Sequence, residues 1–167
     1  MTPKADQTQN PSHNLRRDEW LPALGALSQA ELQEAVPALL EEYALEHQRL
    51  PEDGLGLLTI RDGAFDQPFY LGEFPVATAH IHLRNESGQE FAGAAHDLGD
   101  AAQKAVHMAV CDAILDNSLP ETPEVLALVQ TGLDRIQARH RQRRAMLERT
   151  RVDFDLLAKD MEGSDGD

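Results

Sequence analysis

The sequence predicts an α+β fold: a small antiparallel sheet with helices packed on one face, two N-terminal helices and a long C-terminal helix. Residues 76–83 alternate polar and apolar side chains, which is the period of a half-buried strand. The turn sequence Asn85-Glu86-Ser87-Gly88 follows, and an alanine-rich helix is predicted over 101–116. Strand, turn and helix in this order are typical of a sheet covered by a helix.

Two helices are predicted before the sheet. Trp20, Leu24 and Leu27 are spaced by helical turns and predict a helix over 17–27. Ser28 and Glu31 form a capping-box pattern, which predicts that a second helix begins there. Its apolar stripe, with Pro37 as a kink, comprises Leu32, Ala35, Val36, Leu39, Leu40 and Tyr43.

The sheet is predicted from short apolar runs between turn signals. Residues 50–54 read as a turn and 55–60 as a first strand, while 65–71 is a loop or an edge strand because it contains Pro68. Residues 89–95 return as the hairpin partner of 76–83, and Gly93 indicates a bulge or a close backbone approach. The face expected to meet a helix carries Ala77, Ala79, Ile81 and Leu83.

The C-terminal half is predicted to be helical. Asp100 is the expected N-cap of the helix over 101–116, whose small residues allow close packing on the sheet. A linker with two prolines, 117–123, precedes a long helix that begins near Val125. We place a single domain at 16–160, between polar tails at 1–15 and 161–167 that we expect to be disordered.

Charge and composition exclude several classes of function. The 29 acidic and 15 basic residues give a formal charge of −14, which repels nucleic acid. No apolar segment approaches the roughly 20 residues that span a bilayer, so we expect no membrane partner and a cytoplasmic protein. A single cysteine, Cys111, rules out an internal disulfide. No phosphate-binding loop, dinucleotide glycine pattern, HExxH motif or nucleophile elbow is present.

Histidines provide one candidate site. His80 and His82 share the polar face of the predicted strand, and His96 on the returning strand would lie near them. Three imidazoles could bind a metal, which gives the hypothesis of a small metalloenzyme. The other interpretation is a surface that meets a partner. His107 and Cys111 lie on the central helix and are interpreted as packing residues.

Arginines provide the second candidate. Seven of the fifteen basic residues fall between Arg135 and Arg151. Because guanidinium groups bind phosphates bidentately, Arg135, Arg139 and Arg143 are candidates for phosphate contact. A solvated helix face and a docking surface for an acidic partner remain alternatives.

Several segments together resemble one family. They are FYLGEFPVATAHIHL at 69–83, the pair Gly93 and Gly99, the helix pattern with Ala105, Ala109 and Asp112-Ala113-Ile114, and the closing Arg151-Val152-Asp153-Phe154. Trp20 fits the opening. Over residues 17–159 the chain resembles the PhnG subunit of the bacterial carbon–phosphorus lyase machinery.

The resemblance implies a non-catalytic subunit of a complex with PhnH-, PhnI- and PhnJ-like proteins. In that family the G, H and I subunits, with the ATPase-like L subunit, exchange the adenine of ATP for a phosphonate, which gives a ribose 1-phosphonate 5-triphosphate. The nucleosidase activity is attributed to PhnI. The iron–sulfur cluster and S-adenosylmethionine are expected on another subunit, and no cofactor on this chain. A free-standing homo-oligomeric adaptor is a third hypothesis.

The chain also departs from the family pattern. Thr78, His82 and Val106 stand where the family often has charged residues, and the turn at 85–90 is two residues longer, so no role is carried over to those positions. The residues expected at an interface are His80, His82, Arg151, Asp153 and Phe154.

Overall fold

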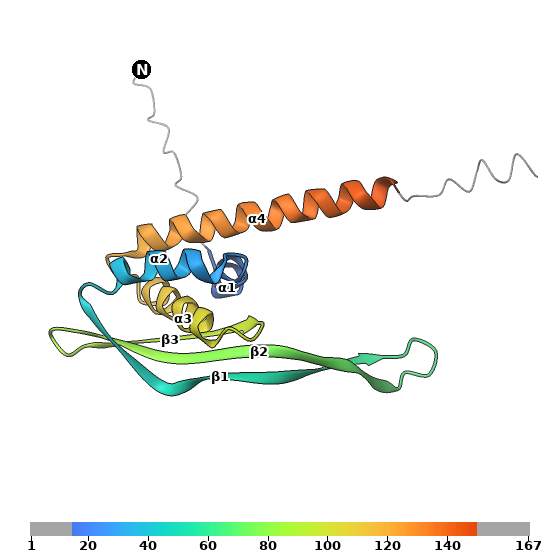
Figure 1. Ribbon diagram of the computed structural model, residues 1–167, viewed down its shortest axis with the longest axis horizontal. Coiled ribbons are helices and arrows are strands. Elements are labelled where there is room, and N and C mark those ends of the chain that lie inside the picture. The colour runs from blue at the N-terminus through green and yellow to red at the C-terminus, as the bar shows by residue number, and fades with distance from the viewer. Residues whose placement is uncertain (1–14, 150–167) are drawn as a thin grey trace, which may run out of the picture. The chain divides into compact units, whose positions relative to one another are not determined.

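A computed structural model describes residues 15–149 and confirms the α+β fold (Figure 1). The chain divides into two compact units, 1–133 and 134–167, which are described separately. The elements are α1 (Arg17–Gly25), α2 (Gln29–Leu39), β1 (Tyr43–Arg61), β2 (Pro68–Asn85), β3 (Glu90–Leu98), α3 (Ala102–Asp116) and α4 (Thr122–Arg149).

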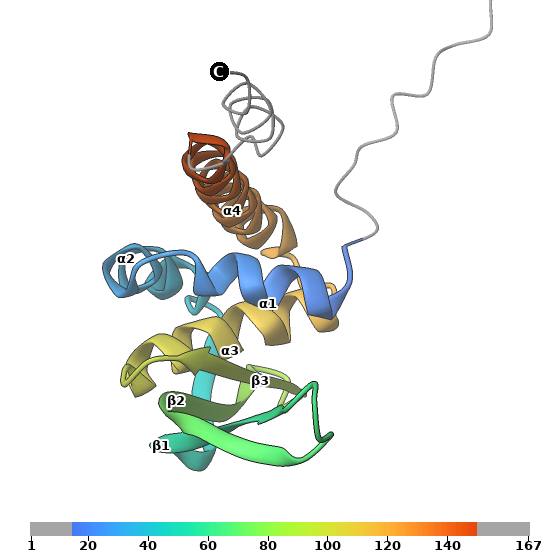
Figure 2. The same cartoon turned by 90° about the vertical axis from the view of Figure 1, so that its right-hand side faces the viewer.

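The first unit is layered. The strands form an antiparallel sheet in the order β1-β2-β3, with β2 in the middle. Helix α3 packs on one face of the sheet, and α1 and α2 pack on the far side of α3 (Figure 2). Helix α3 is therefore enclosed by sheet below and helices above, which explains why its residues from Ala105 to Ile114 are all buried.

Glycine and alanine allow these layers to approach closely. A Cβ atom at Gly93 would lie 2.2 Å from the carbonyl oxygen of Ala109, so only glycine fits where β3 meets α3. This confirms the close approach predicted there. A Cβ atom at Gly132 would lie 2.0 Å from the carbonyl oxygen of Ala23, so the start of α4 touches the backbone of α1 in the same way. Both positions exclude a side chain because backbone atoms cannot move aside.

Most predicted elements are confirmed. The capping box of Ser28 and Glu31 begins α2, with the Glu31 N–H donating to Ser28 Oγ at 3.3 Å. The alternation in β2 is confirmed, since all four residues of the predicted helix-facing set are buried: Ala77, Ala79, Ile81 and Leu83. Helix α3 begins at Ala102, but Ala101 and not Asp100 is its N-cap, and no side chain bonds the cap. Gly99, at φ +150°, instead donates its N–H to Pro75 and keeps the chain against β2 up to that point.

The prediction for residues 40–54 is wrong. The second helix was expected to continue through Tyr43, but α2 ends at Leu39 and β1 begins at Tyr43. Pairing with β2, which places Leu45 opposite Leu83, outweighs the local helical spacing. The turn predicted at 50–54 is also wrong, because β1 runs through it. Pro51, which has no N–H to donate, falls where the register shifts between Arg49 and Glu52, so its missing hydrogen bond does no harm.

A buried carboxylate joins α1, α3 and β3. The side chain of Asp112 in α3 is fully buried. It accepts hydrogen bonds from the Arg17 guanidinium, from Trp20 Nε1 at 3.0 Å and from the Ala94 N–H at 3.0 Å. Sequence reasoning gave Asp112 no role. The sequence did contain a signal for this role, namely an aspartate within an otherwise apolar helix. Such an aspartate needs hydrogen-bond donors when it is buried.

A lysine makes a second link among the same elements. Lys104 Nζ donates to the carbonyl oxygen of Gly25 at 2.7 Å and lies 2.8 Å from Asp97 Oδ2. Both charged side chains are only 12% exposed. The carbonyl groups at the end of a helix attract cations, so Lys104 binds the last residue of α1 while Asp97 of β3 balances its charge.

His107 and Cys111 are packing residues, as predicted. Burial raises the pKa of the Cys111 thiol to about 12, so the thiol stays protonated and unreactive. Burial lowers the pKa of His107. The Nε2 atom of His107 lies 3.1 Å from Gln103 Nε2, while its Nδ1 has no hydrogen-bond partner among residues 15–149.

Substituting Asp112 with Asn should destabilise the fold. Three donors converge on the carboxylate, and an amide must turn its own NH₂ group toward one of them. We expect Asp112→Asn to lower the free energy of unfolding by about 3 kcal/mol, at the low end for a broken buried pair because Arg17 is half-exposed. Urea unfolding measures this. Asp116→Asn on the exposed end of the same helix is the control, with less than about 0.5 kcal/mol expected. Equal losses in both variants would contradict the role of Asp112.

His107 should make stability depend on pH. Its folded pKa lies below the ordinary value of 6.5, so below that pH the unfolded chain binds a proton that the folded chain excludes. The free energy of unfolding should therefore fall as the pH drops below 6.5, by at most about 1.4 kcal/mol per pH unit, until the folded pKa is reached. Urea unfolding of His107→Gln, with exposed His47→Gln as control, measures it. A wild-type pH dependence in His107→Gln would refute the prediction.

Candidate functional site

The candidate site is the outer face of the sheet, the face opposite α3. On β2 it carries Val76, Thr78, His80, His82 and Arg84, which alternate with the buried residues. Figures 1 and 2 show α1, α2 and α3 on the other side of the sheet. Within residues 15–133 no helix covers the outer face, so its polar side chains are available to a partner.

Two histidines of the outer face meet as predicted. The rings of His80 and His96 pack edge to face with centroids 6.2 Å apart, and Thr78 Oγ1 lies 2.9 Å from His96 Nδ1. His82 lies two residues after His80 on β2, opposite Glu46 on β1 and Ala92 on β3. The three-imidazole metal site is not assembled, because in the described residues no group of three or more His, Cys, Asp or Glu side chains is placed to hold a metal.

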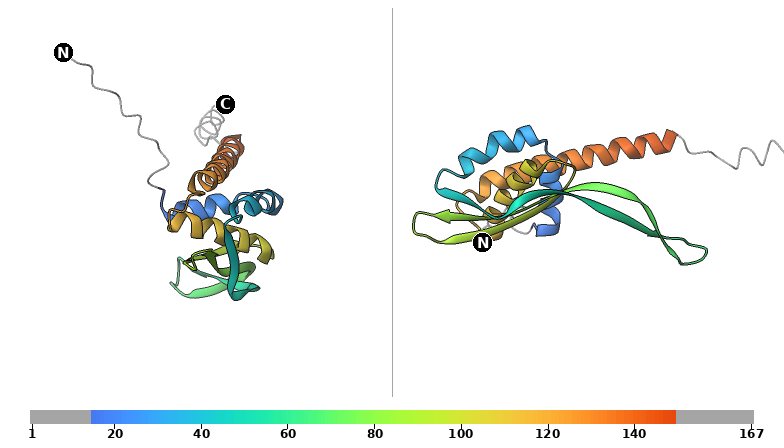
Figure 3. Two further views of the ribbon diagram at one scale, coloured as in Figure 1. Left: turned by 90° about the vertical axis from the view of Figure 1, so that its left-hand side faces the viewer. Right: turned by 60° about the horizontal axis from the view of Figure 1, so that its bottom comes forward.

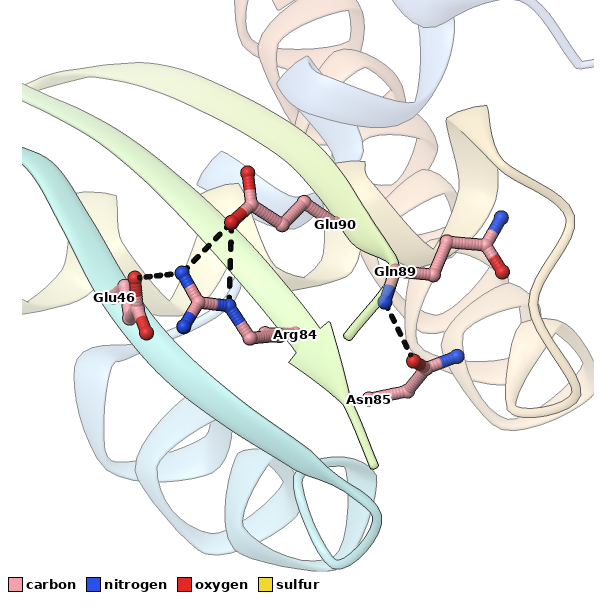
Figure 4. Close-up of polar contacts among 5 residues, drawn as sticks. All are labelled: Glu46, Arg84, Asn85, Gln89 and Glu90. Atoms are coloured by element: carbon pink, nitrogen blue, oxygen red, sulfur yellow. Dashed lines mark hydrogen bonds and ion pairs between the residues drawn. The ribbon is translucent and has the colours of Figure 1, made fainter. Parts of the chain in front are cut away.

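An arginine links all three strands on this face (Figure 4). Arg84 Nη2 donates to Glu46 Oε2 on β1 at 2.9 Å and to Glu90 Oε1 on β3 at 2.7 Å. Glu46 lies on β1, three residues beyond Tyr43, the last residue of the apolar stripe predicted for the second helix. Such exposed pairs contribute at most about 1 kcal/mol each, so their main effect is to fix where charge lies on the face. Sequence reasoning missed this group because it depends on the register between β1 and β2.

The turn beside Arg84 borders an acidic hollow. Asn85 Oδ1 accepts from the Gln89 N–H at 2.9 Å and so holds the turn (Figure 4). The hollow is lined by Glu41, Glu42, Asn85, Glu86 and Ser87. Its three carboxylates repel phosphate groups, so the hollow does not suit a phosphorylated ligand.

The predicted phosphate-binding arginines lie in the second unit. Arg135, Arg139 and Arg143 are exposed and follow one another at intervals of four residues, so they lie along one side of α4. Residues 134–149 hold six arginines and two acidic residues, which makes this helix segment strongly basic. Arg151, Asp153 and Phe154, the other predicted interface residues, lie outside the described residues.

The structure brings some of the predicted residues together and not others. His80, His82 and His96 share the outer face, whereas the arginines belong to the other compact unit. None of the helices described between residues 15 and 149 is long and apolar enough to cross a membrane.

Comparison with known proteins identifies the family. The family model described as phosphonate metabolism protein PhnG matches residues 15–159. No match was found among curated proteins. The match covers most of the 167 residues and all of the described ones. The chain therefore belongs to the PhnG family of phosphonate metabolism proteins.

Proposed function

We propose that this chain is the PhnG subunit of a carbon–phosphorus lyase core complex. With PhnH-, PhnI- and PhnL-like proteins it would support the synthesis of ribose 1-phosphonate 5-triphosphate from ATP and a phosphonate, next to a PhnJ-like subunit. The observation that carries the proposal is the family match over residues 15–159. The uncovered outer face supports a role in assembly, because a polar face of this kind suits protein contact.

The charge of the first unit supports a non-catalytic role. In the proposed reaction a phosphonate oxygen attacks C1′ of the ATP ribose, and the bond from C1′ to adenine breaks as adenine leaves with a proton. Both substrates are anions. Residues 15–133 hold 20 acidic and 6 basic side chains, so this unit repels them. We therefore assign the chemistry to partner subunits and assembly to this chain.

The outer face is the proposed docking surface for the PhnI-like subunit. His80, His82 and Arg84 supply polar groups. On the β3 side of the face, the small side chains of Ala92 and Ala94 leave room for a partner. Arginine is enriched at protein interfaces, and here Glu46 and Glu90 balance the charge of Arg84 while the two histidines add hydrogen-bonding groups. Of the described residues, Arg135, Arg139 and Arg143 fit a triphosphate best, because they are exposed guanidinium groups on one side of a helix.

The cofactors of the complex belong on another subunit in this proposal. An iron–sulfur cluster needs several cysteine thiolates, and this chain has only Cys111. That thiol is buried within α3 with a raised pKa, so it is not available as a ligand. The residues present therefore do not fit a cluster.

Reconstitution tests the proposed function. ATP and methylphosphonate are mixed with purified PhnH-, PhnI- and PhnL-like proteins, with or without this chain, and adenine release is followed by chromatography. We expect a new phosphonate ester, seen by phosphorus NMR, only when the chain is present, whereas adenine alone can also come from the nucleosidase activity of the PhnI-like subunit. Full activity without the chain would refute the proposal.

A matched pair of variants tests the docking surface. His80 lies on the outer face, while His47 is exposed on β1 opposite Ile81 and so lies on the other face. We expect His80→Glu to weaken binding to the PhnI-like subunit about tenfold and His47→Glu to leave it unchanged. Calorimetric titration gives both affinities, and the unfolding temperature controls for folding. Equal affinities would place the interface elsewhere.

A further inference from the structure

The hairpin of β1 and β2 extends well beyond the third strand. Strand β3 ends at Leu98, opposite Val76. Beyond that point only two strands continue, 55–61 of β1 and 68–74 of β2, joined by the turn at 62–67. We call residues 55–74 the arm. Figures 1 and 3 show it projecting past β3 and α3.

The arm exposes an unusual amount of apolar surface. Leu55 is 71% exposed, Tyr70 69% and Phe65 77%. The other large exposed apolar residues of the arm are Leu57, Leu58, Ile60, Phe69 and Leu71. Proteins that act alone rarely leave so large an apolar patch in water. A two-stranded hairpin without a third layer is also marginally stable. The arm therefore needs a cover.

Both faces of the arm are apolar. Leu57 and Leu58 are successive residues of a strand, so they point to opposite faces, and the same holds for Phe69 and Tyr70. A flat surface would cover only one face. The partner must therefore hold the arm in a cleft.

The arm is built to keep its shape. A Cβ atom at Gly56 would lie 2.5 Å from the ring of Phe74, so that ring lies over the glycine and joins the two strands. At the tip, Arg61 Nη1 lies 3.2 Å from Asp66 Oδ1, and the Asp66 N–H donates to the carbonyl of Asp62 at 2.9 Å. These contacts restrict the conformations of the free hairpin, so it loses less entropy when it enters a cleft.

Charge selects the kind of partner. The arm contains three acidic side chains, Asp62, Asp66 and Glu73, and one basic side chain, Arg61, and two more acidic residues, Glu52 and Asp53, directly precede it. We call these five acidic residues the acidic rim. Two arms would repel each other, which disfavours pairing of arms between copies of this chain. A cleft bordered by lysine and arginine would complement the acidic rim.

We propose that the arm inserts into an apolar cleft, bordered by basic side chains, on another subunit of the complex. This inference rests on the proposed function and adds a second contact to it, separate from the outer face. Apolar residues on both faces supply the affinity, and the acidic rim orients the arm.

Variants of exposed leucine and tyrosine test the proposal. The chain is co-expressed with PhnH-, PhnI- and PhnJ-like subunits, and the complex is measured by native mass spectrometry. We expect the double variant Leu57→Lys with Tyr70→Lys to lower the amount of assembled complex at least tenfold. Phe65→Lys at the tip is an independent variant that perturbs no strand pair. Leu50→Lys, on the same strand outside the arm and 79% exposed, is the control and should assemble normally.

A second measurement tests whether basic side chains border the cleft. Glu73→Lys should weaken assembly, and the affinity of the wild-type complex should fall as salt rises, because salt screens exposed charges. Circular dichroism of each isolated variant shows whether it folds.

The possible outcomes distinguish the arm proposal, the basic cleft and the proposed function. Normal assembly of all arm variants would overturn the arm proposal and leave the proposed function standing. Absence of any complex with the wild-type chain would overturn both. Loss of assembly in the leucine and tyrosine variants, with no effect of Glu73→Lys or of salt, would overturn the basic cleft. A wild-type homodimer that the same variants abolish would identify a second copy as the occupant and overturn the proposal of another subunit.

Discussion

The burial of Asp112 is the constraint on which the first unit depends. A fully buried carboxylate is tolerated only when donors surround it, and here Arg17 and Trp20 come from α1 while Ala94 comes from β3. Lys104 acts at the other end of the same helix through the carbonyl of Gly25. Since α1 begins at Arg17 and ends at Gly25, two charged side chains of α3, the buried Asp112 and the largely buried Lys104, hold both ends of α1.

This fixed arrangement determines which surfaces remain open. Helices α1, α2 and α3 lie on one side of the sheet, and the small residues at Gly93 and Ala109 let α3 settle directly on β3. The opposite face of the sheet therefore has to be polar, and Arg84 with Glu46 and Glu90 makes it so. The arm lies past the end of α3 and receives no cover from these three helices, although its side chains are as apolar as those of a core.

The sequence allowed prediction wherever a short pattern and its environment agreed. The alternation around Ile81 and the capping box at Ser28 depend on neighbours in the chain, and both were predicted. The second half of β1 was predicted as the strand 55–60, but its first half, 43–54, was not, because Pro51 and Gly54 signal a turn locally, and only pairing with β2 turns that signal into a register shift. The contacts of Asp112 and Arg84 were missed for the same reason, since their partners are distant in sequence. The histidine pair was found, but its geometry depends on how Thr78 orients His96.

The arm shows most clearly why apolar pattern alone does not determine burial. The run from Leu55 to Ile60 reads as a buried strand, and in this chain its large side chains are exposed. An apolar pattern predicts that a surface is buried in the functional protein. It does not tell whether the residues that bury it belong to the same chain or to another one. We propose that the cover comes from other subunits, and the acidic residues around the arm favour basic ones. The charge of residues 15–133 fits this proposal, because a surface that would repel the anionic substrates of the proposed reaction can still attract the basic border of a neighbouring protein.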